Sequence, residues 1–548
     1  MTAAYIVMGI FSAFMINYKA LCFRKVIDAL TDRTLTFGGI AAYGGVLLIV
    51  YGMGYLDQYP EKKLEHGIYL DFKLLALRKI STIDYLEYSK IGTGRLVQQI
   101  ENGAAAGRNV VFHFWIVLVR ELFPAVLFSI CFIWKINRSV TYVLLGGYIV
   151  IFIVTNILLK FLYRIKEKVL DNEELLNHYL VRGFMEMSLF RLGRQFPGEI
   201  KKAERAKNII VASKVKMNMI HEAFFTIFVL LVSALDIGIL FYAWHDRSLS
   251  VGSVVALVTL IENAYMPIAI FNVIYVQYRL DKASYARFEA FLHTADDERL
   301  YEGRRLDREI GEILVKDLSF RYGEESVFDG LNLSVKRGEK VAFVGESGSG
   351  KSTFVKILAG LLKYDTGHVF WGGLELKDLC LDDLYGRIAY LSQDAPVFDG
   401  TIRENLVFDK QEEDGQMIEA LERVQLSDLL LKNELGLEAE IGERGACLSG
   451  GEKQRLALAR LWFESPEVVI LDEATSAMDN LTEENVMEEI IRRFKKQTVI
   501  AVAHRLNAVR DFDRIVVFKD GKIAGEGTFE GLMRENGYFA QLYRAGMS

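Results

Sequence analysis

The second half of the chain contains a stretch with the composition of a phosphate-binding loop, Gly345 to Ser352. The apolar run 341–344 before it predicts a buried strand, and the spacing at 352–358 after it predicts a helix. Glycines let backbone N–H groups turn toward a phosphate, a lysine pairs with phosphate oxygens, and a serine hydroxyl can bind Mg²⁺. The candidate phosphate-binding residues are Gly345, Glu346, Ser347, Gly348, Ser349, Gly350, Lys351, Ser352 and Thr353.

Two adjacent carboxylates, Asp472 and Glu473, follow a continuous apolar run at 468–471. That run predicts a strand buried in a parallel sheet, so both acids emerge at its carboxyl end, where such sheets bind ligands. We expect Asp472 to hold Mg²⁺ beside Ser352, and Glu473 to polarise or deprotonate an attacking water. Two acids can also simply end a strand, but a phosphate-binding loop in the same chain favours the chemical interpretation.

A third motif, Leu448-Ser-Gly-Gly-Glu-Lys-Gln-Arg455, precedes a segment with helical spacing. Taken in order with the two motifs above, it resembles the signature of the ATP-binding cassette (ABC) family. The resemblance implies that Ser449 and the two glycines after it face the γ-phosphate of ATP bound to an opposite subunit. The family usually has Gln at the fifth position, where this chain has Glu452, and this departure leaves the phosphate-facing atoms unchanged.

Further short motifs fit the same family. The resemblance implies that Tyr322 stacks on adenine, that Gln393 lies in the Q-loop, and that His504, after the apolar run 499–503, lies near the γ-phosphate. Positions 476–479 resemble the D-loop and positions 441–445 the X-loop of exporters. The implied ligands are ATP and Mg²⁺. The expected site residues are Glu473 and His504 for catalysis; Tyr322, 345–353, Gln393, Ser449, Gly450, Gly451 and Glu452 for the nucleotide; and Ser352, Gln393 and Asp472 for the metal.

The composition indicates more than one domain. The chain has 548 residues, 51% of them hydrophobic, and a mean hydropathy of +0.19, which is high for a wholly soluble protein. The apolar excess lies before about residue 290. A net charge of −6 gives no indication of a nucleic-acid partner. The cysteines lack the spacing of a zinc site or a disulfide framework: Cys22, Cys131, Cys380 and Cys447.

Six apolar segments in the first part are each about 20 residues or longer, as a helix needs to cross a membrane. The first has no basic stretch before it and no small-residue cleavage site after it, so we expect a retained helix rather than a signal peptide. The ABC family commonly has another helix before this point, so we expect that this helix is missing or that the start is truncated. The expected spans are 2–26, 40–59, 110–134, 140–163, 220–244 and 251–275.

Lys and Arg concentrate in two connections, between the second and third spans and between the fourth and fifth. Cytoplasmic connections are enriched in these residues, so we expect both connections and both termini inside a multi-pass plasma-membrane protein. The periodic segments 68–83 and 169–184 predict helices that extend beyond the membrane. The resemblance to type IV ABC exporters implies coupling helices at 84–89 and 184–192; solvated hairpin tips are the alternative.

The predicted fold is an all-α six-helix transmembrane domain at 1–295, a charged linker at 296–311 and an α/β P-loop ATP-binding cassette domain at 312–548. The resemblance implies a half-transporter in membrane lipid that pairs with a second chain, identical or different, and exports a small molecule, lipid or peptide. An ATP-gated channel or regulator on the same scaffold is the alternative. A soluble ABC ATPase is excluded by the apolar spans.

Three ionisable residues fall inside the expected spans: Arg120, Glu121 and Glu262. Each lies about 14 residues from the outer end of its span, or roughly 21 Å of helix, so their depths are expected to be similar. Ionisable residues at such depth usually face the bundle interior or pair with each other. They are therefore interpreted either as part of a translocation path or as an Arg120–Glu262 ion pair that only holds helices together.

Overall fold

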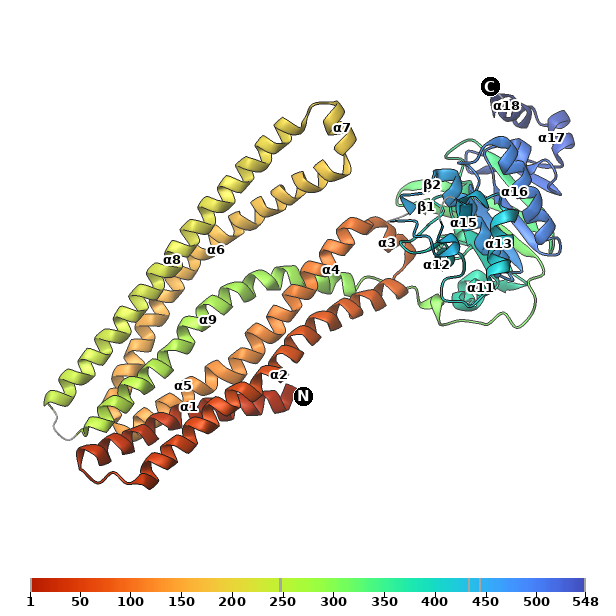
Figure 1. Ribbon diagram of the computed structural model, residues 1–548. Coiled ribbons are helices and arrows are strands. Elements are labelled where there is room, and N and C mark those ends of the chain that lie inside the picture. Colours follow the sequence, from red (N-terminus) through yellow and green to blue (C-terminus); the bar gives the residue numbers. More distant parts are fainter. Residues whose placement is uncertain (1, 246–248, 432–433, 443–444, 547–548) are drawn as a thin grey trace. The chain divides into compact units, whose positions relative to one another are not determined.

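The computed structural model describes residues 2–245, 249–431, 434–442 and 445–546 (Figure 1). The chain divides into two units, which are described separately. The helical unit contains Met1–Ser81 and Ile91–Thr294, and the α/β unit contains Thr82–Lys90 and Ala295–Ser548. The short segment Thr82–Lys90 therefore belongs to the α/β unit although long helices flank it in the sequence.

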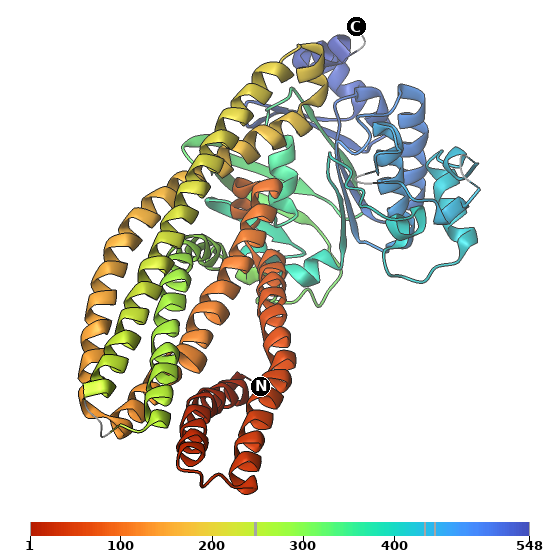
Figure 2. The same ribbon diagram turned by 60° about the vertical axis from the view of Figure 1, so that its left-hand side comes forward.

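Long helices build the helical unit. Two of them, α2 and α6, continue far past their apolar parts, as the periodicity of 68–83 and 169–184 predicted. The helices α6 and α8 pack side by side as a hairpin with the short α7 at its tip (Figures 1 and 2). In chain order the helices before residue 295, including α3 of the α/β unit, are α1 (Thr2–Thr31), α2 (Phe37–Thr82), α3 (Tyr85–Ile91), α4 (Thr93–Arg108), the π-helices η1 (Asn109–Ile116) and η2 (Leu118–Leu122), α5 (Phe123–Ile136), α6 (Arg138–Met185), α7 (Met187–Leu192), α8 (Phe196–His245) and α9 (Val251–Leu292).

Within the described ranges, five helical segments are long and apolar enough to cross a membrane. They contain five of the six predicted spans. The predicted span at 140–163 lies on α6 and stays a prediction, because the side chains of 151–152 and 154–163 lie outside the described ones. The five segments are Thr2–Thr31, Phe37–Thr82, Leu96–Ile136, Phe196–His245 and Val251–Leu292.

Arg120 has partners other than Glu262. It lies in η2, is 3% exposed, and forms ion pairs with Asp57 of α2 and with its neighbour Glu121. Its Nε donates to the carbonyl oxygen of Tyr5 at 3.2 Å, and its guanidinium lies 3.9 Å from the centre of the Tyr5 ring. The predicted Arg120–Glu262 ion pair is therefore wrong, because position along a helix gives depth but not the direction of the side chain. Glu262 itself is exposed on α9.

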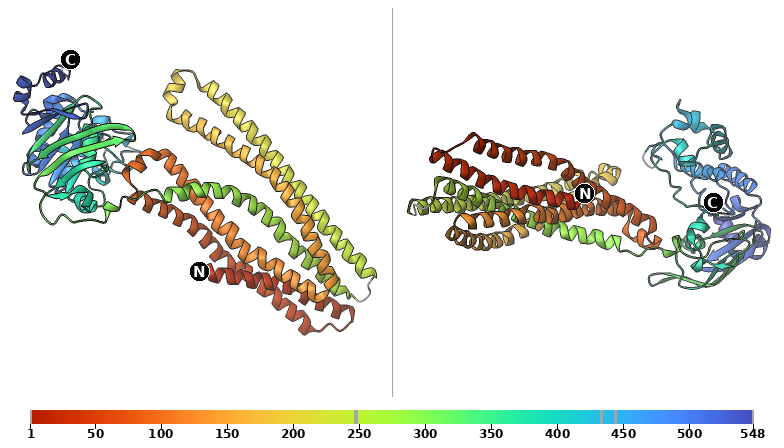
Figure 3. Two further views of the ribbon diagram at one scale, coloured as in Figure 1. Left: turned by 180° about the vertical axis from the view of Figure 1, so that it is seen from behind. Right: turned by 90° about the horizontal axis from the view of Figure 1, so that it is seen from below.

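Two sheets form the core of the α/β unit (Figure 3). The larger has the order β10-β9-β3-β8-β7-β6, in which β10 pairs antiparallel with β9 and the other neighbours are parallel. The smaller is antiparallel, in the order β2-β1-β4-β5. The strands are β1 (Ile313–Tyr322), β2 (Glu325–Val335), β3 (Lys340–Gly345), β4 (Thr366–Trp371), β5 (Leu374–Glu375), β6 (Ile388–Leu391), β7 (Val468–Asp472), β8 (Thr498–Val502), β9 (Arg514–Lys519) and β10 (Lys522–Gly527).

Each residue of β7 and β8 is buried, which explains why their sequences are continuous apolar runs rather than alternating ones. Segments that contain helices connect the parallel strands of the larger sheet, as parallel pairing requires. Other helices of the α/β unit precede the first strand or follow the last one. These helices are η3 (Glu298–Leu300), α10 (Lys351–Leu358), η4 (Leu376–Asp378), α11 (Leu381–Tyr385), α12 (Ile402–Val407), α13 (Asp414–Arg423), α14 (Asp428–Leu431), η5 (Gly436–Glu438), α15 (Gly450–Ala459), η7 (Arg460–Phe463), α16 (Asn480–Arg493), η8 (Leu506–Val509), α17 (Phe529–Glu535) and α18 (Gly537–Gly546).

The segment 296–311, predicted as a linker, packs into the α/β unit. Leu306 and Ile310 are each 3% exposed and belong to the same apolar cluster as the smaller sheet. These two apolar residues lie within a charged stretch. The linker prediction was based on the charge of the stretch alone.

The predicted first coupling helix is anchored within the α/β unit. Tyr85 and Leu86 of α3 pack against the apolar cluster that contains Phe354 and Leu358. Asp84, just before α3, forms a 2.7 Å ion pair with Lys363, which also lies 3.5 Å from a carboxylate oxygen of Asp297. Both apolar packing and ion pairing therefore attach α3 to this unit.

Candidate active site

Four neighbouring parallel strands, in the order β3, β8, β7 and β6, end at one edge of the larger sheet. The register brings their ends level: Val502 pairs with Phe343 on one side and with Asp472 on the other. The loops that follow these strands carry the glycine-rich stretch, His504, Glu473 and Gln393, and Asp472 is the last residue of β7. Four segments predicted separately from sequence therefore meet where parallel sheets bind their ligands.

The loop between β3 and α10 requires its glycines. Gly345, Gly348 and Gly350 have φ values of +150°, +82° and +101°. A Cβ on Gly345 would lie 2.2 Å from the carbonyl oxygen of Phe518, and one on Gly350 would lie 2.7 Å from the Phe328 ring, whereas the space around Gly348 is open to 4 Å. The loop leads directly into the N-terminus of α10, where backbone N–H groups attract anions. A phosphate group fits this loop.

Lys351 is curled into the same loop. It is 3% exposed, and its Nζ donates to the carbonyl oxygens of Gly345 at 2.9 Å and Glu346 at 2.8 Å. Ser349, also buried, has its hydroxyl 3.4 Å from Nζ, while Ser347 and Glu346 are exposed. Burial lowers the pKa of Lys351, although the carboxylates of the site oppose this effect.

Ser352 and Asp472 form the candidate metal pair. The Ser352 hydroxyl donates to Asp472 Oδ1 at 2.7 Å, and the Tyr390 hydroxyl donates to Oδ2 at 3.3 Å. Asp472 is 1% exposed, and burial raises its pKa, while the hydrogen bond from Ser352 lowers it. Mg²⁺ prefers oxygen ligands and takes one or two from a protein together with substrate phosphates, so this pair fits the ion. Tyr390 was not predicted as part of the site.

Glu473 is held between two predicted residues. Its Oε1 lies 2.6 Å from His504 Nε2, and its Oε2 accepts a hydrogen bond of 2.7 Å from Gln393 Nε2. The side chain of Glu473 is 10% exposed, whereas His504 and Gln393 are exposed. The backbone of Glu473 has φ +55°, an uncommon conformation for a residue with a side chain, which persists mainly at functional sites. The contact of Gln393 is with Glu473, and its role as a metal ligand stays a prediction.

The signature motif forms the start of a helix. Ser449 is the N-cap of α15: its hydroxyl accepts from the Glu452 N–H at 3.3 Å, and the Glu452 carboxylate accepts from the Ser449 N–H at 2.8 Å. This reciprocal capping box gives Glu452 a structural role at the position where the family usually has Gln. Gly450 and Gly451 open the helix, and a Cβ on Gly451 would lie 3.0 Å from the carbonyl oxygen of Ala477.

The remaining predicted positions are less informative. Tyr322 ends β1 and is 40% exposed, and Thr353 lies in the first turn of α10; their nucleotide contacts stay predictions. Positions 443–444 of the predicted X-loop lie outside the described residues. Sequence reasoning missed Gln454, whose Oε1 accepts from the Ala477 N–H at 2.8 Å and so ties α15 to the D-loop. Its place two residues after Glu452, in the same motif, was the available signal.

The chain resembles known transporters. The ABC transporter family profile matches residues 328–476. The mitochondrial iron-sulfur clusters transporter atm1 of Neurospora crassa is 28% identical over 95% of this chain and 76% of its own length. The uncharacterized ABC transporter ATP-binding protein YwjA of Bacillus subtilis is 34% identical over 61% of this chain and 58% of its own. The ATP-dependent lipid A-core flippase of Neisseria meningitidis is 40% identical over 41% of this chain and 37% of its own.

A solved structure shares the fold. A bacterial Atm1-family ABC exporter with ATP bound has a TM-score of 0.84 and 20% identity over 100% of this chain and 98% of that one. Three observations indicate the same class of protein. Apolar helices precede an α/β domain, the loops at its strand ends carry ABC motifs, and the relatives include exporters. The chain is therefore a multi-pass half-transporter of the type IV ABC exporter family, in which an ATPase drives export across a membrane.

Proposed function

We propose that the chain binds ATP with Mg²⁺ at the edge of the larger sheet and hydrolyses it through Glu473. The observation that supports this most is the position of the Glu473 carboxylate, which Gln393 and His504 hold from two sides. A carboxylate fixed in this way can accept a proton from a water that attacks a phosphate. Bound Mg²⁺ would supply charge neutralisation at the phosphates, with Ser352 and Asp472 as its ligands.

We further propose that the active species is a dimer of half-transporters. The chain carries one glycine-rich phosphate loop and one signature motif, and the family sandwiches each γ-phosphate between the two from opposite subunits. A complete site therefore needs a second chain, related by approximate two-fold symmetry. Because Glu473, His504 and Ser449 are all present, a homodimer is the preferred form.

The tip of the α6–α8 hairpin supports a role in coupling. Three of its apolar side chains are exposed: Phe184 by 86%, Leu189 by 67% and Leu192 by 85%. An ion pair between Arg182 and Glu199 joins the two helices beside this tip. Exposed apolar surface of this kind marks an interaction site. We propose that α7 docks on a nucleotide-binding domain and, with α3, transmits ATP-driven closure to the membrane helices.

Orientation and substrate complete the proposal. The basic extensions of α6 and α8 favour a cytoplasmic position for the hairpin tip, the α/β unit and both termini. The membrane that we propose for the chain is the plasma membrane. The names of the relatives give iron-sulfur clusters in one case and the lipid A-core in another. These classes are too different to choose between, so the exported molecule is sought by experiment among lipids, peptides and small molecules.

The test is transport by the purified chain reconstituted in lipid vesicles with the α/β unit outside. Lipids, peptides and drug-like compounds are screened for stimulation of Mg²⁺-dependent ATP hydrolysis, and stimulating compounds are then tested for uptake. Uptake against a gradient by the wild-type chain, and none by Glu473→Gln, is the expected result. Flux that ATP opens but that never exceeds equilibrium would instead favour the channel alternative. Activity that appears only with a second polypeptide would replace the homodimer with a heterodimer.

A further inference from the structure

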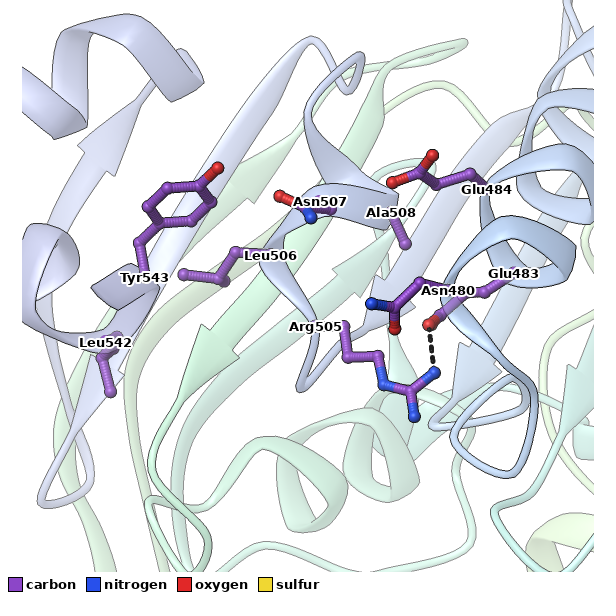
Figure 4. A pocket seen from close by; sticks show the side chains of 9 residues that line it. All are labelled: Asn480, Glu483, Glu484, Arg505, Leu506, Asn507, Ala508, Leu542 and Tyr543. Carbon is purple, nitrogen blue, oxygen red and sulfur yellow. Dashed lines mark hydrogen bonds and ion pairs between the residues drawn. The ribbon is translucent and has the colours of Figure 1, made fainter. Parts of the chain in front are cut away.

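An ion pair lies beside the site, between the buried Glu483 of α16 and Arg505 (Figure 4). Glu483 is 3% exposed, and its Oε2 lies 3.1 Å from Arg505 Nη1. Its other oxygen accepts a hydrogen bond of 2.7 Å from the Thr475 hydroxyl. The Arg505 guanidinium also donates to the carbonyl oxygen of Met478. Each carboxylate oxygen of Glu483 therefore has a partner from a different segment.

The positions of these partners in the sequence give the pair its significance. Thr475 lies two residues after Glu473, Met478 lies in the D-loop, and Arg505 directly follows His504. One carboxylate therefore connects the segment that carries the expected base to the segment that carries the histidine in contact with it. The 2.6 Å contact between Glu473 and His504 spans the same two segments.

A second contact extends this connection to the signature helix. Gln454 of α15 is 5% exposed; its Nε2 donates to the Ser476 hydroxyl at 3.1 Å, and its Oε1 accepts from the Ala477 N–H. The D-loop is thus held on one side by α15 and on the other by Glu483 and Arg505. Movement of the signature helix would therefore be transmitted to His504 through this chain of contacts.

The environment of the pair favours a fixed geometry. Burial raises the pKa of Glu483, while hydrogen bonds from Thr475 and Arg505 lower it. A buried carboxylate is costly unless it is paired, so removal of either partner strongly disfavours the arrangement. The Arg505 side chain is 40% exposed toward a pocket whose other lining residues include Asn480, Asn507 and Tyr543 (Figure 4). A different side chain at position 505 would therefore meet solvent rather than a packed core, but Glu483 would still lose its charge partner.

We propose that Glu483 and Arg505 form a positioning pair for hydrolysis, which holds the D-loop and His504 in the geometry that Glu473 requires. In this role neither residue contacts the nucleotide or the attacking water. The pair acts through Thr475, Met478 and His504. The inference rests on the proposed ATPase site, because it assigns a function to residues around that site.

The test compares steady-state ATP hydrolysis by reconstituted full-length variants. Glu483→Gln keeps an acceptor for Thr475 but removes the charge that faces Arg505. We expect kcat to fall about tenfold, with KM for ATP unchanged within about threefold, since ATP-contacting residues are untouched. Arg505→Gln should have the same effect, and Arg505→Lys, which retains the charge, should keep most of the wild-type rate.

A double-mutant cycle separates a coupled pair from two independent defects. If the two residues act as one unit, Glu483→Gln with Arg505→Gln is no slower than either single variant. The matched control is Glu488→Gln, on the same helix, whose side chain is 74% exposed in an i,i+4 pair with Arg492. This control should keep the wild-type rate.

Two results would overturn the inference: wild-type kcat in Glu483→Gln, or multiplicative losses in the double variant. Arg505→Gln alone decides the matter if Glu483→Gln fails to fold, as checked by its melting temperature and ATP binding. Failure of the proposed function has a different signature, since the wild-type chain itself would then show no hydrolysis that depends on Glu473.

Discussion

Arg120 of the helical unit and Lys351 of the α/β unit are both cations with 3% exposure, but their surroundings differ. Arg120 contacts two carboxylates, a carbonyl oxygen and an aromatic ring. The contacts of Lys351 in the described part of the chain are carbonyl oxygens and a hydroxyl, with no ion pair. The charge of Arg120 is neutralised by the protein, whereas that of Lys351 is left for an anionic ligand. Buried charge thus marks structure in one unit and a ligand site in the other.

The largest expected effect concerns chemistry at the ligand site. Glu473→Gln should slow ATP hydrolysis by about a hundredfold or more while ATP binding is retained, because only the proton acceptor is lost. Lys351→Ala should instead weaken ATP binding itself, since the cation that faces the phosphates is removed. Hydrolysis assays and equilibrium binding of a fluorescent ATP analogue separate the two effects. A Glu473→Gln protein that hydrolyses ATP at nearly the wild-type rate would show that another group is the base.

The next effect concerns the stability of the helical unit. Asp57→Ala leaves the Arg120 guanidinium without its partner on α2 and should destabilise the protein by about 3 kcal/mol, as for other broken buried ion pairs. Replacing both residues by apolar ones, with Asp57→Leu and Arg120→Met, should cost much less. Thermal unfolding in lipid nanodiscs measures both. Equal losses in the single and double variants would mean that Arg120 is needed for something other than its charge partner.

A smaller effect is expected at Gly9, where α1 passes Arg120. A Cβ at this position would lie 2.1 Å from Arg120 Cγ, so Gly9→Ala should destabilise the protein by about 1–3 kcal/mol through overpacking. Gly44→Ala is the matched control, because the space around Gly44 in α2 is open to 4 Å and alanine favours a helix. The two melting temperatures should move in opposite directions. A neutral Gly9→Ala would contradict the packing of α1 on η2.

The smallest effect is the pH dependence of Asp472. Burial raises the pKa of Asp472 above its value in the unfolded chain, so the wild type loses stability as the pH rises from about 4 through the folded pKa. Without Mg²⁺-ATP, Asp472→Asn should therefore raise the melting temperature at pH 7 by no more than about 4 °C, and the difference should vanish near pH 4. Asp479→Ala is the control of opposite sign, because the Thr482 N–H lowers the pKa of Asp479 and this cap stabilises the fold. A lower melting temperature for Asp472→Asn at pH 7 would contradict the raised pKa of Asp472.

Much of the site in the α/β unit could be predicted from sequence. Lys351, Ser352 and Glu473 lie beside predicted strand ends, and the strict order of parallel strands brings such ends together whatever the intervening sequence. Glu483 and Tyr390 were missed for the opposite reason. A carboxylate within a helix and a tyrosine within a strand have no local pattern that distinguishes them, and their partners lie far away in the sequence.

Less could be predicted for the helical unit. Apolar length located five of the six expected spans, and basic residues favoured an orientation, since both depend on sequence composition alone. The partner of Arg120 could not be found in this way, because Asp57 lies on another helix and pairing depends on rotation about both helix axes. The π-helical turns of η1 and η2 change that rotation and leave no recognisable sequence pattern.

The positive φ of Glu473 constrains how this position can drift during evolution. A left-handed backbone costs a β-branched residue most, and glycine, asparagine and aspartate least. The turn is fixed on both sides of Glu473, because its N–H donates to the carbonyl oxygen of Val502 at 3.2 Å and its carbonyl oxygen accepts from the Ser476 N–H at 3.2 Å. Relatives that abandon hydrolysis should therefore replace this glutamate with glycine, asparagine or aspartate far more often than with valine or isoleucine. The backbone conformation of the turn should therefore be retained even in relatives that have lost hydrolysis.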